Sequence, residues 1–279
     1  MEAVYLSRND VANLQRKLIG KGTDGSVYDV GHGYLYKIYH DGSAFSDIDV
    51  AHPLLDGYED DVKIYQKGKS YLYRNHNFCF KYTDINDVRI SAQDSIYLAI
   101  QRQKDIQYTR LPLAPIYVNS RFKGCVLKKH AFHCQFHSFS FLPEEQRRKL
   151  LLLVTERVEE IVRHYIYPLD IWNRPCEKKL SHSNILLSLL GVPELIDMDG
   201  KSTIYTEKED FSLLQNVLRG LNILVLEFLY NIDLSDEMTD EDVSLLEQFL
   251  FYKGLSDNYV DKLVYQEADF STLRKVLKR

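Results

Sequence analysis

Apolar and polar residues alternate along much of the first half of the chain, where aromatic and β-branched residues are common. A period of two is typical of strands that bury one face. Strands are predicted in this half at Tyr34–Tyr39, Tyr71–Arg74, Phe78–Tyr82, Ala114–Asn119 and Gly124–Lys129, besides those that flank the glycine-rich segment described below. One helix is expected among them, over Ser91–Lys104, because Ile96, Ala99 and Ile100 share one helical face and Ser91 can cap its start.

From about residue 140 the hydrophobic period becomes helical. Pro143 opens a long segment whose apolar residues recur every three or four positions from 150 to 165. Residues 209–229 are apolar on nearly every side, which predicts a fully buried helix. A further helix is expected to begin at Thr239, in a capping-box-like start, and to end near Gly254.

The order of these elements predicts an α+β chain with two lobes. We expect a β-rich N-lobe over residues 1–137 and a helical C-lobe over residues 138–279. Within the first lobe, residues 41–61 contain seven acidic residues and no Lys or Arg, which indicates an exposed loop or insertion.

Composition narrows the class of protein. In 279 residues, 35 Lys and Arg against 40 Asp and Glu give a formal net charge of −5, which argues against non-specific nucleic-acid binding. The most apolar stretch, Leu221–Tyr230, is interrupted by Asn222 and Glu227, so no transmembrane helix is expected. Four scattered cysteines are too few for a disulfide scaffold. These features predict a reduced, soluble, cytoplasmic protein without a membrane partner.

A glycine-rich segment is the first chemical signal. Gly20, Gly22, Gly25 and Val27 fit the pattern G-x-G-x-x-G-x-V. In a dinucleotide-binding turn the glycines lead into a helix, but here they lead into a strand, a tight turn and a second strand. The segment therefore predicts a hairpin whose backbone amides can approach phosphate oxygens. An ordinary glycine-containing hairpin is the alternative.

Lys37 lies inside the strand that follows this hairpin, between Tyr36 and Ile38. A lysine at that place could reach the α- and β-phosphates of a nucleotide and partly neutralise their charge. Lys81 is a rival because it lies closer to the helix expected at 91–104, and Lys37 on a solvated strand face is the simpler alternative. We favour Lys37 because of its distance behind the glycines.

The second chemical signal lies between residues 167 and 200. Asn184 precedes the apolar run Ile185–Leu187, and Asp197 follows Glu194-Leu-Ile. An amide oxygen and a carboxylate at such loop–strand junctions can share a hard Mg²⁺ ion. Taken separately, Asn184 is better explained as a turn residue and Asp197 as a loop carboxylate.

Taken together, these motifs resemble the protein-kinase-like superfamily across roughly residues 15–235. The segment 18–28 looks like the Gly-rich loop, Lys37 the strand lysine, and Asn184 the end of the catalytic loop. Asp197 matches the metal-binding Asp of D-F-G, while Asp199, which we also expect to bind the metal, stands where the family has Gly. Asp210 looks like the residue that braces the catalytic loop at the start of the buried helix. The resemblance implies a bilobal fold that binds ATP and Mg²⁺ in a cleft shared by both lobes, and phosphoryl transfer.

Two departures bear on catalysis. The family's catalytic Asp lies five residues before the Asn, where this chain has Lys179. Asp170 could take that role, with Asn184 and Lys37 completing the catalytic set, if nine extra residues bulge out before Asn184. The helix expected at 91–104 also contains no Glu to pair with Lys37.

Three functions follow from these expectations. The first is an atypical kinase that transfers the γ-phosphoryl group of Mg·ATP to a protein Ser or Thr hydroxyl. The second is a pseudokinase, a nucleotide-binding or scaffold module that contacts a protein partner. The third is a phosphotransferase acting on a small molecule.

Overall fold

The structure is a computed structural model of the whole chain. It describes residues 2–22, 25–40, 63–67, 70–74, 79–82, 92–102, 106, 111–129, 133–168, 171–173, 182–188, 190–196, 198, 203–205, 208–232, 234 and 239–279. These residues form a mixed α and β structure that divides into two compact units. The first unit comprises Met1–Ala131, His164–Tyr167 and Ile196–Ser212; the second comprises Phe132–Arg163, Pro168–Leu195 and Leu213–Arg279.

The first unit contains a six-stranded sheet with the strand order β1-β8-β9-β4-β3-β2. Its strands are β1 (Val4–Leu6), β2 (Leu18–Lys21), β3 (Gly25–Gly31), β4 (Tyr34–Tyr39), β8 (Ala114–Val118) and β9 (Arg121–Lys128). β1 runs parallel to β8, and the other neighbouring strands are antiparallel.

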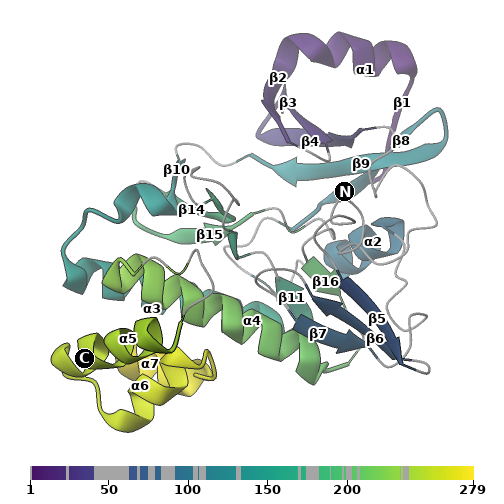
Figure 1. Cartoon of the computed structure of the whole chain (residues 1–279). Coiled ribbons are helices and arrows are strands. Elements are labelled where there is room, and N and C mark those ends of the chain that lie inside the picture. The colour runs from purple at the N-terminus through teal and green to yellow at the C-terminus, as the bar shows by residue number, and fades with distance from the viewer. Residues whose placement is uncertain are drawn as a thin grey trace. The chain divides into compact units, whose positions relative to one another are not determined.

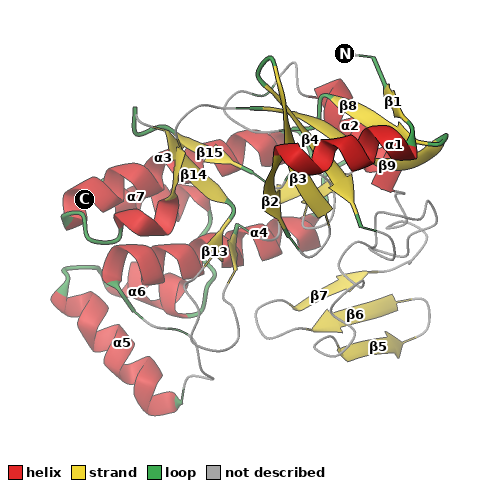
Figure 2. Ribbon diagram, turned by 90° about the horizontal axis from the view of Figure 1, so that it is seen from above, coloured by secondary structure: helices red, strands yellow, loops and turns green. Residues whose placement is uncertain are grey.

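Two helices lie on opposite sides of this sheet, as Figure 1 shows. On one side, Leu14 of α1 (Arg8–Leu14) packs in a core cluster with Tyr28, Ile38 and Val126. On the other side, Ile96 of α2 (Ala92–Arg102) packs with residues of β4 and β9. Figure 2 shows α1 lying across the strands. The alternation of the strands therefore separates two apolar faces, each covered by its own helix.

The rest of the first unit is built from short strands. Three form an antiparallel sheet in the order β5-β6-β7, at Lys63–Lys67, Ser70–Arg74 and Cys79–Tyr82. Two segments of similar sequence, Tyr34-Leu-Tyr-Lys37 and Tyr71-Leu-Tyr-Arg74, belong to different sheets: the first lies on β4 in the large sheet and the second on β6 in the small one. A two-stranded sheet joins β11 (Ile166–Pro168) to β16 (Thr203–Tyr205).

The second unit is mainly helical. Its helices are α3 (Glu144–Arg163), α4 (Phe211–Leu224), α5 (Asp240–Tyr252), α6 (Asp257–Val264) and α7 (Phe270–Leu277). Its strands are β10 (His133–Gln135), β12 (Trp172–Asn173), β13 (His182–Ser183), β14 (Ile185–Ser188) and β15 (Pro193–Leu195). β14 pairs with both β10 and β15, and β12 pairs with β13.

The helix predicted over residues 209–229 is present and largely buried. α4 continues as one π-helical stretch, Val225–Leu229, and most of its side chains are buried. By length and apolarity the span Phe211–Leu229 could cross a membrane, but 72% of it is buried inside the structure. Phe211, the first residue of the helix, is 70% exposed. We therefore assign the span as a core helix.

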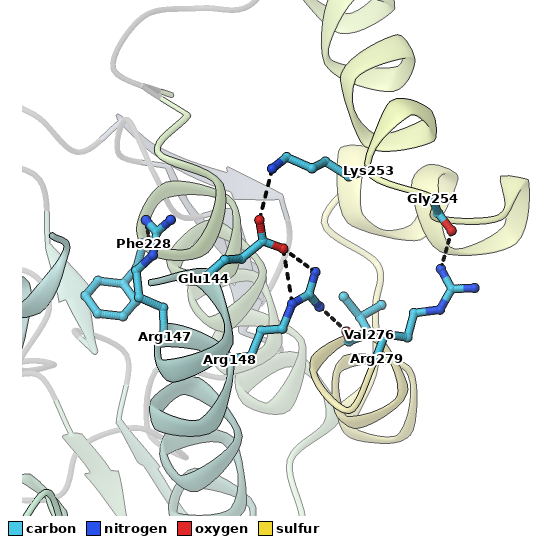
Figure 3. Close-up of polar contacts among 8 residues, drawn as sticks. All are labelled: Glu144, Arg147, Arg148, Phe228, Lys253, Gly254, Val276 and Arg279. Carbon is cyan, nitrogen blue, oxygen red and sulfur yellow. Dashed lines mark hydrogen bonds and ion pairs between the residues drawn. The ribbon is translucent and has the colours of Figure 1, made fainter. Parts of the chain in front are cut away.

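Ion pairs fix the last helices to the start of α3 (Figure 3). Glu144 accepts hydrogen bonds from Arg148, one turn further along α3, and from Lys253 at the end of α5. Arg148 also donates to the carbonyl oxygen of Val276 in α7, at 2.7 Å. Burial raises the pKa of Glu144, but the hydrogen bonds from Lys253 and Arg148 outweigh it and lower the pKa below its usual value.

Candidate functional site

The glycine-rich segment forms the predicted hairpin. β2 pairs with β3 so that Gly20 lies opposite Val27 and Lys21 opposite Ser26. The N–H of Gly22 donates to the carbonyl oxygen of Gly25 at 2.9 Å, which closes the end of the hairpin. No helix follows the glycines directly: β3 leads through a tight turn into β4, as the sequence predicted.

Steric contacts distinguish the three glycines. A Cβ on Gly25 would lie 2.8 Å from the carbonyl oxygen of Ile38, so this glycine is required by the fold. A Cβ on Gly20 would meet nothing within 4 Å, and one on Gly22 would meet only the Gly25 oxygen at 3.8 Å, among the described residues. Packing therefore gives no reason for glycine at 20 and 22, whereas a ligand approaching the backbone would need the missing Cβ.

The turn that follows the hairpin is stabilised by glycines and by hydrogen bonds to Asp29. Gly31 and Gly33 have φ values of +83° and +78°, which favour glycine. Asp29 accepts hydrogen bonds from the Gly31 N–H and from the Lys129 ammonium group. The hydrogen bond from Lys129 lowers the pKa of Asp29. The lysine ties the β3–β4 turn to the end of β9.

Lys37 lies in the middle of the large sheet, directly opposite Val27 on β3 and Cys125 on β9. Residues directly opposite each other in an antiparallel sheet project from the same face. Lys37 therefore shares a face with Val27 and with the core cluster that α2 covers, in which Cys125 and Tyr39 are buried. Its side chain is half-buried, and its Nζ lies 6.0 Å from the centre of the Tyr39 ring.

The rival lysine belongs to another sheet. Lys81 lies on β7, where it pairs with Leu72 of β6, and β7 is not part of the sheet that contains the glycines. Lys37, by contrast, is one strand away from Val27 and two from Gly20. The backbone arrangement thus connects the glycine-rich hairpin with Lys37.

The backbone pairing just before Asn184 accommodates the extra residues that separate it from Asp170. β12 pairs with β13 so that Trp172 lies opposite Ser183 and Asn173 opposite His182. The Asn184 N–H donates to the carbonyl oxygen of Ile171 at 3.3 Å. Without residues 174–181, Asn184 would stand six positions after Asp170, against five in the kinase catalytic loop. Asp170 itself lies outside the described residues, and Asn184 is half-buried.

The remaining metal-ligand candidates, Asp197 and Asp199, also lie outside the described residues. Met198 between them is 2% exposed. Its carbonyl oxygen accepts a hydrogen bond from the Tyr205 hydroxyl, and its sulfur accepts one from Thr203 at 3.5 Å. β16 therefore fixes the backbone at the centre of the Asp197-Met-Asp199 motif.

The segment before α4 is tied to the strand that precedes Asp170. The Asp210 backbone N–H donates to the phenol oxygen of the buried Tyr167, at 2.8 Å. The resemblance led us to expect a brace between Asp210 and the catalytic loop. The structure shows a backbone contact from Asp210 to a tyrosine that our sequence reasoning did not single out, and the expected brace stays a prediction.

Comparison with known proteins adds little. No protein-family model matches the chain, and no curated protein sequence matches it. Among solved structures it is similar to an apo pseudokinase, with 11% sequence identity, 99% of this chain and 85% of that chain covered, and a TM-score of 0.46. At that TM-score we base no conclusion on the likeness.

Proposed function

We propose that this chain is a kinase-like protein that binds Mg·ATP and transfers the γ-phosphoryl group to a Ser or Thr hydroxyl of a protein. The observation that carries the proposal is the cross-strand alignment of Val27 with Lys37 behind a hairpin whose first two glycines have no packing role among the described residues. This combination suits a nucleotide whose phosphates lie under the hairpin and near the lysine.

The residues fit the groups that the proposal requires. The missing Cβ atoms of Gly20 and Gly22 let phosphate oxygens approach the backbone of the hairpin, and Lys37 supplies a positive charge. Asn184, Asp197 and Asp199 offer the hard oxygen donors that Mg²⁺ prefers. Bound Mg²⁺ would neutralise charge that develops on the phosphates.

Asp170 has the role of accepting the proton of the substrate hydroxyl as that oxygen attacks phosphorus. The bond between the γ-phosphorus and the bridging oxygen breaks, and ADP leaves with the negative charge. The Asn184–Ile171 hydrogen bond supports this assignment because it holds the residue after Asp170 next to Asn184.

A pseudokinase is the second candidate. The observation that favours it is the composition of α2, Ala92–Arg102, which contains no glutamate. In active kinases a glutamate on the corresponding helix pairs with the lysine. In this case the chain binds nucleotide, transfers phosphate poorly, and acts through a protein partner.

Transfer of ³²P from labelled ATP to a Ser/Thr peptide library distinguishes the two candidates. For an active kinase, Asp170→Ala lowers the rate by about 100-fold or more, as expected when a positioned proton acceptor is lost. Mg·ATP affinity should stay within about threefold, since the carboxylate acts on the hydroxyl, not on the nucleotide. Equal transfer by both proteins would disprove the role of Asp170, and no transfer with intact nucleotide binding would identify a pseudokinase.

A further inference from the structure

We infer that Tyr39 is a positioning residue for Lys37, and that its ring holds the lysine ammonium group in place through a cation–π contact. The inference rests on the proposed function, because the position of Lys37 matters for activity only if phosphates bind beside it.

The two side chains lie on the same face of the sheet. Lys37 and Tyr39 are two positions apart on β4, and side chains at that spacing project in the same direction. The Lys37 Nζ lies 6.0 Å from the ring centre, within reach of the negative face of the π system. Tyr39 is 3% exposed and Lys37 is half-buried, so water competes only partly with the ring for contact with the ammonium group.

The ring is itself fixed by its surroundings. It packs against Phe122, with ring centres 5.9 Å apart and planes tilted by 50°. Its hydroxyl donates to the Cys125 sulfur at 3.8 Å, and Cys125 is the residue directly opposite Lys37 on β9. Ile96 of α2 belongs to the same buried cluster. The lysine therefore lies beside a ring that cannot easily turn away.

Such a contact would serve phosphate binding in a specific way. A lysine has a long flexible stem, and ordering it on a ligand costs side-chain entropy. The ring orders the stem before the ligand arrives. Unlike a carboxylate, a neutral ring does not cancel the positive charge that the phosphates need. An aromatic residue on the lysine's own strand thus offers a positioning device that does not depend on a glutamate from α2.

A double-mutant cycle in the nucleotide-free protein tests the contact itself. Tyr39→Leu and Lys37→Met are made singly and together, and the equilibrium constant of unfolding is measured in urea. Tyr39→Leu changes this constant by some factor in each background. If the ring holds the ammonium group, that factor is about two- to fivefold smaller in the Lys37→Met background than in the native chain. Equal shifts in both backgrounds would overturn the inference.

Tyr39→Phe provides the conservative variant, because it keeps the ring and the fold and removes only the hydroxyl. The Lys37 Hε resonances should be shifted upfield by the ring current in the native chain and in Tyr39→Phe. Unshifted Hε resonances in the native chain would contradict the inference, whatever the stability of Tyr39→Leu.

Mg·ATP titration then separates this inference from the proposed function. Tyr39→Phe should bind within about twofold of the native chain, and Tyr39→Leu about two- to fivefold more weakly. Coupling in the cycle without any Mg·ATP binding would support the contact and refute the proposed function. Binding that is equal in all three proteins, without coupling, would refute the contact and leave the function standing.

Discussion

The backbone N–H of Asn184 lies 3.3 Å from the carbonyl oxygen of Ile171, although the two residues are 13 positions apart in the sequence. The β12–β13 pair between them makes this approach possible. The contact brings together the residues that precede and follow the segment 174–181.

We therefore predict that residues 174–181 can be replaced by Asn-Gly. A two-residue turn fits the register in which Asn173 lies opposite His182. Shortening the loop about fourfold changes the closure entropy by about 1.2 kcal/mol at most, so the free energy of unfolding in urea should change by no more than this. Mg·ATP affinity should be unchanged. As a control, removing 172–183 also deletes both strands and should be strongly destabilising; a similar loss in the Asn-Gly variant would contradict the prediction.

Gly124 should be essential for the strand that carries Lys37. A Cβ at this position would lie 2.0 Å from the carbonyl oxygen of Lys37, which is backbone and cannot rotate away. We expect Gly124→Ala to lower the free energy of unfolding by about 2–3 kcal/mol, the usual cost of overpacking. Gly220→Ala is the matched control, because outside the helix's own backbone that Cβ would meet no atom of the described residues within 4 Å. In a helix interior it should stabilise the chain by about 0.5–1 kcal/mol. Equal effects of the two substitutions in urea unfolding would refute the steric argument.

Parts of this arrangement could be predicted from sequence because the signals are local. The strand Tyr34–Tyr39 matches its prediction at both ends, and the capping box at Thr239 and the turn glycines 31 and 33 are where their chemistry requires them. The contacts that organise the candidate site are not local. β1 pairs with β8 over only three positions, and β12 and β13 have two residues each. Segments this short do not produce a hydrophobic period in the sequence.

Non-local contacts also explain why two tyrosines at the candidate site were not predicted from the sequence. The phenol of Tyr167 reaches Asp210 from 43 positions away, and Tyr39 contacts Lys37 only because both are on one sheet face. The second relation had a signal, since the two residues are i and i+2 on a predicted strand. The first had none that a single sequence could provide.

The ion pairs around Glu144 predict a pH dependence of stability. Because its folded-state pKa is lowered, Glu144 contributes stability above its usual pKa, and this contribution is lost as the pH falls through the lower folded value. Glu144→Gln should therefore lower the free energy of unfolding at pH 7, by about 1–2 kcal/mol for the loss of charged hydrogen bonds to Arg148 and Lys253.

The difference between Glu144→Gln and the native chain should shrink as the pH falls from 5 toward 3, measured by urea unfolding at each pH. Glu145→Gln is the control, because Glu145 pairs only with the exposed Lys149 among the described residues, and exposed pairs contribute little. A difference at Glu144 that stays constant down to pH 3 would mean that the ionised carboxylate is not its source.

The glycine-rich hairpin offers a test that separates ligand binding from folding. Gly20→Val places a side chain on an exposed edge strand, where a Cβ meets no described atom within 4 Å. The free energy of unfolding should therefore change by less than about 0.5 kcal/mol. If phosphates approach the backbone there, Mg·ATP affinity should fall at least about tenfold, which corresponds to about 1.4 kcal/mol. Unchanged affinity would show that the hairpin is an ordinary one.

Calorimetric titration of Mg·ATP into the native chain and into Lys37→Met tests the central claim most directly. The native chain should bind with a measurable enthalpy, and Lys37→Met should bind at least about tenfold more weakly while still unfolding in a cooperative transition in urea. The same titration with Lys81→Met should match the native chain. Absence of binding by the native chain, or equal affinity of the native chain and Lys37→Met, would contradict the account.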